Sequence, residues 1–595
     1  MTPTTPISLF QISSRLWGHV GGKRQKQFII LLSLMIFVSF AEVVSIGSVI
    51  PFLGILTAPD QFLKLPVAHA TFEYFNFSTP EQLLLPVTII FAVAAVIAGA
   101  LRLTLLWASI RFSYSAGADL SISIYRRTLY QPYWIHIGRN SSEIINGIAN
   151  KTGAAVNAIN AVLTLIGSSI ILSAIIVALL VVDPVVALSV FFSGGVIYLM
   201  VIKLTRKRQL IYGQLVADES TKVIKILQEG LGGIRDILID GSQPVYCDIF
   251  SKSDNLLRRA QGNNQFIGQS PRYLMETLGM ILIAALAYVL MQQGDTLGAV
   301  VPTLGALALG AQRLLPVSHQ AYSAWSNIQG AQASIQDVLE LLDQPMPVDE
   351  LLSDEPINFS VEIILNKIGF RYSLEAPFVF ENVYLKIAKG SRVGIVGSTG
   401  AGKSTLIDIF MGLLTSTVGT LEVDGVAITQ LNCRSWQSLV AHVPQAIFLA
   451  DSTIEENIAF GVPKDQIDHG RVTKAAIQAQ LHQVIAGWEN GYKTIVGERG
   501  VRLSGGQRQR IGIARALYKN ASIIVFDEAT SALDAETEGA VMDAIDALDH
   551  DLTVLIIAHR VSTLKNCSSI VQLGNGKIEW TGNYFDYVEK IKTSS

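Results

Sequence analysis

Six long apolar runs in the first half of the chain most constrain what this sequence can fold into. Each approaches the roughly 20 apolar residues that a helix needs to cross a bilayer. The runs are Phe28–Leu56, Leu83–Ile110, Ala155–Val182, Val185–Leu204, Tyr273–Met291 and Leu297–Val317. Because only 16% of the 595 residues are charged, the composition also favours the membrane class. We therefore expect an α-helical polytopic membrane domain with six transmembrane helices.

The lysines and arginines beside these runs predict the orientation of the domain. They gather before the first run, between the second and third, and after the fourth, whereas Thr57–Gln82 contains only Lys64. Both termini and both long loops should therefore be cytosolic. The aromatic residues of Thr57–Gln82 form either a short amphipathic helix at the outer interface or an ordinary aromatic belt. We expect no cleavable signal peptide, since the first run, of about 30 residues, is too long for one.

Charge and cysteine content exclude some partners. The net charge of −3 predicts no attraction to nucleic acid, so we expect no nucleic-acid partner. The cysteines, Cys247, Cys433 and Cys567, lack the spacing of metal ligands or of a disulfide pair, and we expect them to be reduced.

Charged residues interrupt the apolar runs at Glu42, Arg102, Arg272, Glu276 and Arg313. An unpaired arginine near the bilayer centre costs about 2.5–3.5 kcal/mol, so three would cost on the order of 8–10 kcal/mol. One explanation is that the arginines pair with the two glutamates, which leaves one cation over. The other is a cationic ring that faces a cavity and receives an anionic head group, because arginine suits phosphate.

The composition changes near residue 340, where a proline-rich, acidic stretch is typical of a linker. Short β-rich runs then alternate with helical patterns, which indicates an α/β domain. We expect the membrane domain to cover 1–340, the linker 341–356 and an α/β P-loop nucleotide-binding domain 357–595.

This second domain contains the phosphate-loop pattern G-x-x-x-x-G-K-[ST] between an apolar run, Val393–Val396, and a helical pattern. Glycines let the backbone approach phosphates, and the helix N-terminus directs free N–H groups at them. Lys403 would reach the outer phosphates, and the Ser404 hydroxyl would bind Mg²⁺. The expected ATP contacts in this loop are Gly397, Ser398, Thr399, Gly400, Ala401, Gly402, Lys403, Ser404 and Thr405.

Polar residues also follow other apolar strands of this domain. Asp527 ends the run Ile523–Phe526 and is placed to hold Mg²⁺, while Glu528 is placed as the general base for the attacking water. Gln445 follows a short run and could touch both the metal ion and that water. His559 ends a further strand and could bond the γ-phosphate or hold the water.

Two more features indicate a nucleotide site. Tyr372, upstream of the phosphate loop, could stack on an adenine ring. Ser504, Gly505, Gly506 and Gln507 begin a basic helix, whose N-terminus would bind another anion.

In this order the motifs resemble those of the nucleotide-binding domain of ATP-binding-cassette (ABC) transporters. The matching segments are Gly397–Ser404 (Walker A), Gln445 (Q-loop), Thr494–Gly500 (X-loop of exporters), Leu503–Gln507 (signature), Ile523–Asp527 with Glu528 (Walker B and catalytic glutamate), Ser531–Asp534 (D-loop) and His559 (H-loop). The number of spans and the domain order also match, so the resemblance covers essentially the whole chain and implies an exporter half-transporter.

The resemblance implies a homodimer. In this family, Ser504–Gln507 of one copy complete the ATP site of the other, so that two ATP molecules lie between two cassettes. The segments Gln131–Ile137 and Gly230–Ile237 would be coupling helices. ATP binding would close the cassettes and turn the cavity outward, and hydrolysis would reset it.

The spans resemble those of bacterial lipid-linked-oligosaccharide flippases over short matches. This resemblance implies that Arg102, Arg272 and Arg313 bind the pyrophosphate of a polyprenyl-linked glycan and that the chain moves it across the bacterial inner membrane. The alternative is an exporter of drugs, peptides or other lipids, in which the arginines are only salt-bridged.

Overall fold

This computed structural model describes residues 9–48, 52, 55, 84–182, 184–292, 297–346, 357–528, 534–546, 551–558 and 560–594; within 181–194 and 289–313 it describes only the backbone. The chain divides into two compact units. Unit 1 contains Met1–Gln131 and Arg139–Met346, and unit 2 contains Pro132–Gly138 and Pro347–Ser595. The predicted domain borders stay a prediction, and the loop Thr57–Gln82 lies outside the described residues.

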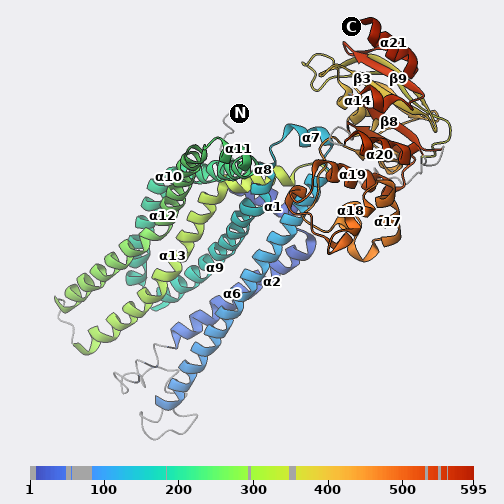
Figure 1. Cartoon of the computed structure of the whole chain (residues 1–595). Helices are drawn as coiled ribbons and strands as arrows, with labels where there is room; N and C mark the ends of the chain where they lie inside the picture. The colour runs from blue at the N-terminus through green and yellow to red at the C-terminus, as the bar shows by residue number, and fades with distance from the viewer. Residues whose placement is uncertain are drawn as a thin grey trace. The chain divides into compact units, whose positions relative to one another are not determined.

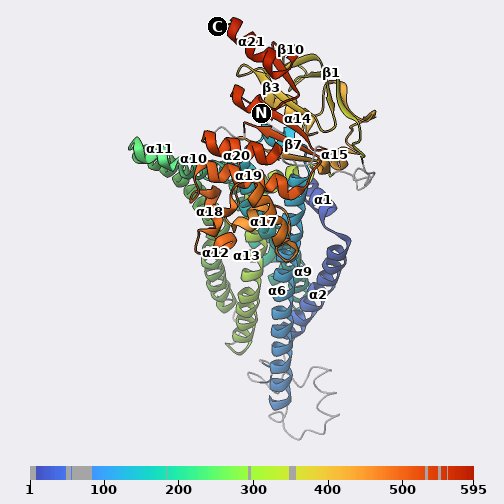
Figure 2. The ribbon, with the colours of Figure 1, turned by 45° about the vertical axis from the view of Figure 1, so that its right-hand side comes forward.

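Unit 1 consists of helices, the long ones lying side by side in Figures 1 and 2. They are α1 (Leu9–His19), α2 (Gly22–Gly47), α6 (Leu84–Leu129), α8 (Ser141–Asn146), α9 (Thr152–Val182), α10 (Pro184–Gly232), α11 (Ile234–Ile239), α12 (Gln243–Gln292) and α13 (Leu297–Leu342). A π-helical turn, Gly147–Lys151, joins α8 to α9. Since α12 has 50 residues, it is far longer than a bilayer requires and continues beyond the membrane.

Three segments of the described chain are long and apolar enough to cross a membrane: Gly22–Ser45, Leu84–Leu129 and Ser141–Val177. The other predicted spans lie on α10, α12 and α13, which are helical there. Large apolar side chains point outward from α2 and α6. For example, Phe37 and Phe40 of α2 are 68% and 70% exposed. In water such a surface would be unfavourable, but in a bilayer the lipid tails cover it.

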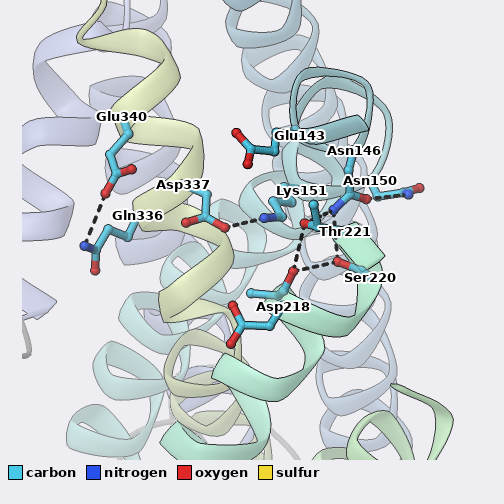
Figure 3. Close-up of polar contacts among 12 residues, drawn as sticks. Glu143, Asn146, Asn150, Lys151, Asp218, Ser220, Thr221, Gln336, Asp337 and Glu340 are labelled. Atoms are coloured by element: carbon cyan, nitrogen blue, oxygen red, sulfur yellow. Dashed lines mark hydrogen bonds and ion pairs between the residues drawn. The ribbon is translucent and has the colours of Figure 1, made fainter. Parts of the chain in front are cut away.

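A polar joint connects helices of unit 1 around the π-helical turn (Figure 3). Lys151, at the end of this turn, pairs with Asp337 of α13, and the lysine side chain is only 10% exposed. Asn146 is fully buried and donates to the hydroxyls of Ser220 and Thr221 on α10, at 3.0 and 2.9 Å. The joint therefore ties α8 and α9 to both α10 and α13.

Unit 2 is an α/β domain. Its strands are β1 (Glu362–Phe370), β2 (Phe380–Ala388), β3 (Arg392–Gly397), β4 (Val418–Val423), β5 (Val426–Ala427), β6 (Val440–Val443), β7 (Ile523–Asp527), β8 (Thr553–Ile557), β9 (Ser569–Gly574) and β10 (Lys577–Gly582). Its helices are α7 (Tyr133–Gly138), α14 (Lys403–Phe410), α15 (Cys433–Leu439), α16 (Ile454–Ile458), α17 (His469–Gln478), α18 (His482–Ala486), α19 (Gly505–Lys519), α20 (Ala535–Asp546) and α21 (Tyr584–Ser594).

The strands form two sheets. One is antiparallel, in the order β2-β1-β4-β5, and the other has the order β10-β9-β3-β8-β7-β6 and is parallel except for β10. The side chains of β8 are all buried and those of β3 and β7 nearly so, because apolar clusters cover both faces of the second sheet. Parallel strands end at a common edge, so the polar residues that follow β3, β6 and β7 lie along the same edge.

Candidate functional site

The phosphate loop connects β3 to α14. Gly400 and Gly402 have φ angles of +85° and +89°, which other residues rarely adopt. A Cβ atom on Gly402 would also lie 2.6 Å from the ring of Phe380. No side chain caps the N-terminus of α14, so its first N–H groups are available to an anion. The loop therefore has the open backbone that phosphate binding requires.

Lys403 lies at the start of α14, beneath this loop. Its ammonium group donates to the carbonyl oxygens of Gly397 and Ser398, at 2.8 and 3.1 Å, and the side chain is 8% exposed. These bonds hold the cation against the loop, where phosphates would lie. Ser404 is exposed at the next position of the helix, and its hydroxyl is accessible to a metal ion.

Tyr372 follows β1 and reaches the same helix. Its hydroxyl is hydrogen-bonded to the hydroxyl of Thr405 at 2.9 Å, and its ring is 5.0 Å from that of Phe370 in an edge-on contact. The residue remains 57% exposed. An aromatic ring beside the phosphate loop thus stays open to stacking, which is compatible with the adenine contact predicted for it.

The acidic end of β7 lies next to Gln445. The amide of Gln445 donates to Glu528 at 2.7 Å, and the backbone N–H of Glu528 donates to Ile557 of β8. Glu528 has a φ of +51°, a left-handed conformation that costs on the order of 1–3 kcal/mol for a residue other than glycine. The surrounding fold therefore holds this carboxylate at the sheet edge in spite of the backbone strain, at the place where a general base would act.

One acidic residue of this site escaped the sequence analysis. Asp408 lies on α14, one helical turn after Ser404, and burial together with the charge of Asp527 raises its pKa to about 6. Tyr133, from α7, has its pKa raised by burial and by the charges of Asp408 and Tyr372. The signal in the sequence was the spacing of four residues from Ser404, which puts both side chains on one helix face.

The predicted signature residues form a helix cap. Ser504 accepts from the N–H of Gln507 at 3.2 Å, and the Gln507 side chain accepts from the N–H of Ser504 at 2.9 Å, which is a complete capping box for α19. In the part of the chain that the structure describes, no hydrogen bond joins Ser504–Gln507 to Gly397–Thr405. His559 and Ser531–Leu533 lie outside the described residues, and Asp534 directly precedes α20.

In the membrane unit, two of the three predicted substrate arginines are paired. Arg102 of α6 contacts the buried Glu42 of α2 at 2.7 Å, and Arg272 of α12 contacts Glu276, one turn along, at 2.7 Å. The backbone places Arg313 on α13, but its side chain lies outside the described residues. Arg272 and Glu276 line a cavity of about 140 Å³ together with residues of α10 and α13.

Apolar, membrane-length helices joined to an α/β unit with a phosphate loop define a membrane protein with a nucleotide-binding domain. A sequence model of the ABC transporter family matches residues 380–531. The ATP-dependent lipid A-core flippase of Saccharophagus degradans is 31% identical over 480 residues, which cover 78% of each chain. That of Cupriavidus metallidurans is 28% identical over 487 residues, 79% of each.

The chain therefore belongs to the ABC transporter family. A solved structure of a bacterial Atm1-family ABC exporter with ATP bound has the same fold, with a TM-score of 0.77 at 21% identity over 96% of each chain. The expected fold class and the expected resemblance to ABC exporters are thus confirmed. The protein is an ABC exporter in a membrane, and it binds ATP and couples ATP hydrolysis to transport.

Proposed function

We propose that this exporter flips an anionic lipid-linked saccharide, a polyprenyl-pyrophosphate glycan, across the membrane. The observation that carries the proposal is the cavity that Arg272 lines, because its side chain stays 57% exposed although it pairs with Glu276. Guanidinium groups bind phosphate oxygens in a bidentate manner. Relatives named for flipping lipid A-core, which is also a lipid, support a lipid substrate.

At the ATP site, the contacts of the described residues support the proposed roles. Gly397–Thr405 would bind the phosphates, Tyr372 the adenine, and Glu528 with Gln445 the attacking water. The role of His559 at that water rests on the sequence motif alone. The donor set also suits Mg²⁺, which prefers oxygen ligands, since Ser404, Asp527 and Gln445 each carry a side-chain oxygen. When bound, Mg²⁺ would neutralise developing charge on the phosphates.

We further propose that two copies of the chain act together, with Ser504–Gln507 of one copy facing the phosphate loop of the other. Within one chain these residues cap α19 and make no hydrogen bond to the phosphate loop among the described residues. The uncapped loop and the signature helix are therefore each half of a site. We also propose that the exporter lies in the bacterial inner membrane. The lysines and arginines beside the spans support an orientation with both termini and unit 2 in the cytosol.

The substrate proposal is tested by flipping of a fluorescent polyprenyl-pyrophosphate glycan in proteoliposomes. Arg272→Ala and Arg313→Ala should each lower the ATP-dependent flipping rate, while ATP binding to unit 2 stays unchanged. Arg111→Ala, an exposed arginine further along α6, is the matched control and should flip as the unchanged protein does. Normal flipping by both of these variants, correctly folded, would rule out this substrate.

The second candidate is an exporter of drugs, peptides or other lipids. The observation that favours it is pairing: Arg102 and Arg272 each contact a glutamate, so their charges are already compensated. A Bacillus subtilis protein named provisionally for multidrug export is 30% identical over 399 residues, 66% of each chain. Stimulation of ATP hydrolysis by cationic drugs, with none by the glycan lipid, would select this function.

A further inference from the structure

The cavity in the membrane unit is lined by three helices and contains more polar groups than Arg272 alone. Tyr198 comes from α10, Arg272 and Glu276 from α12, and His319 and Gln320 from α13. We propose that Tyr198 and His319 determine specificity by donating hydrogen bonds to a phosphate or diphosphate oxyanion held against Arg272. This inference rests on the proposed function, because it adds two contacts to the same site.

Two buried polar atoms in this lining, the hydroxyl of Tyr198 and Nδ1 of His319, have no hydrogen-bond partner among the residues that the structure describes. Native proteins satisfy nearly all buried polar atoms, so two unpaired ones on one cavity require an explanation. Neither atom has surface open to water, so each side chain must rotate towards the cavity before an oxyanion there can accept from it and remove the deficit. A ligand therefore explains these two polar groups better than the stability of the unit does.

The balance of donors and acceptors favours an anion over a cation. Arg272 donates through Nε to Glu276 at 2.7 Å, which engages the one carboxylate among the described lining residues. The terminal N–H groups of the guanidinium, the tyrosine O–H and the imidazole N–H remain as donors. A bound cation would find only a carboxylate that is already paired, whereas a phosphate would find at least three donors.

The size of the cavity limits what it selects. At about 140 Å³ it is smaller than the roughly 300–1,000 Å³ of pockets that enclose drug-sized ligands. A phosphate group fits such a space, and an oligosaccharide does not. The site would therefore recognise the phosphates that link the lipid to the glycan, and it would not discriminate between glycans.

The test uses the full-length protein in lipid nanodiscs and measures ATP hydrolysis while farnesyl diphosphate or inorganic diphosphate is added. Tyr198→Phe and His319→Leu should each raise, about tenfold, the farnesyl diphosphate concentration that gives half-maximal stimulation of ATP hydrolysis. This is the effect expected when one hydrogen bond to a charged group is lost. Tyr114→Phe, at an exposed tyrosine on α6 outside the cavity lining, is the control and should change nothing. A response to the lipid alone assigns the site to a head group, and equal responses to both probes assign it to the free anion.

Folding does not confound this test, because the Tyr198 hydroxyl has no partner and Tyr198→Phe should leave Tm unchanged. If both variants respond as the unchanged protein does while Arg272→Ala loses its response, this inference fails and the proposed function stands. If Arg272→Ala also responds normally, both fail. Stimulation by tetraphenylphosphonium that is lost in Glu276→Gln would assign the cavity to a cation and overturn the inference.

Discussion

Replacing Asn146 with alanine should destabilise unit 1 more than any exposed substitution nearby. Asn146 is fully buried, donates two hydrogen bonds to α10 and accepts one from Asn150 at 2.8 Å. The hydroxyls of Ser220 and Thr221 also donate to Ala217, so the substitution strands no donor. The cost is two or three hydrogen bonds at about 1 kcal/mol each plus a small cavity, hence roughly 2–3 kcal/mol.

The matched control is Asn157→Ala, because Asn157 is exposed on the neighbouring α9. Its expected cost is below about 0.5 kcal/mol, as for surface substitutions. At about 2–4 °C per kcal/mol, Tm of Asn146→Ala should fall by roughly 4–12 °C. Thermal unfolding of the purified, nucleotide-free protein in detergent, followed by tryptophan fluorescence, measures both. Equal shifts in the two variants would show that the joint in Figure 3 contributes nothing to stability.

Three further predictions concern unit 2. Glu528→Gln should lower ATP turnover at least about 100-fold with ATP binding intact, since an amide is no general base. The control is Glu536→Gln, at an exposed glutamate on α20. Unimpaired turnover by Glu528→Gln would refute the assignment of Glu528 as the general base. Dimers with Lys403→Ala in one copy and Ser504→Ala in the other should keep one intact ATP site. Dimers with both changes in the same copy should keep none. Equal ATP hydrolysis by the two dimers would contradict an ATP site that the second copy completes. Burial lowers the pKa of His442 to about 4, so the unfolded chain binds the proton first and stability should be lost as pH falls from about 6.5 towards 4. His442→Gln should flatten that part of the Tm profile, and an unchanged profile would exclude His442 as the cause.

The nucleotide site was predictable because its signals are local. A strand, a glycine-rich turn and a helix follow one another within Val393–Phe410, and the structure has each of them. The acidic end of β7 was equally predictable from the sequence, because an apolar run that stops at Asp527 indicates a buried strand that ends at a sheet edge. Asp408 was missed, since only packing shows that a carboxylate one turn after Ser404 lies near Asp527.

Contacts in the membrane unit could not be predicted in the same way. The sequence left pairing and a cationic ring open for Arg102, and the contact with Glu42 depends on how α2 packs against α6. The bond between Lys151 and Asp337 joins residues 186 positions apart, which periodicity does not encode. Local patterns thus predict elements and short motifs, while long-range polar pairs require the packed structure.

Two segments lead from unit 1 into unit 2, and contacts within unit 1 tie their starting points together. Gln131 is the last residue before Pro132–Gly138, and its amide donates to the carbonyl of Pro345, next to the linker, at 2.9 Å. Arg127 donates to the carbonyl of Gln344 at 2.6 Å. We therefore expect movement of either segment to pass to the other through this pair of bonds.

Cutting these bonds should weaken the coupling of hydrolysis to transport without stopping hydrolysis. Arg127→Leu combined with Gln131→Leu should retain basal ATP hydrolysis, because neither residue belongs to the ATP site. The ratio of transport to hydrolysis in proteoliposomes should fall about fivefold or more, the lower range of coupling energies between sites. Arg126→Leu removes an exposed neighbouring cation and should keep the ratio. If the double variant keeps it too, the two segments act independently, and the force from ATP binding reaches the helices by another route.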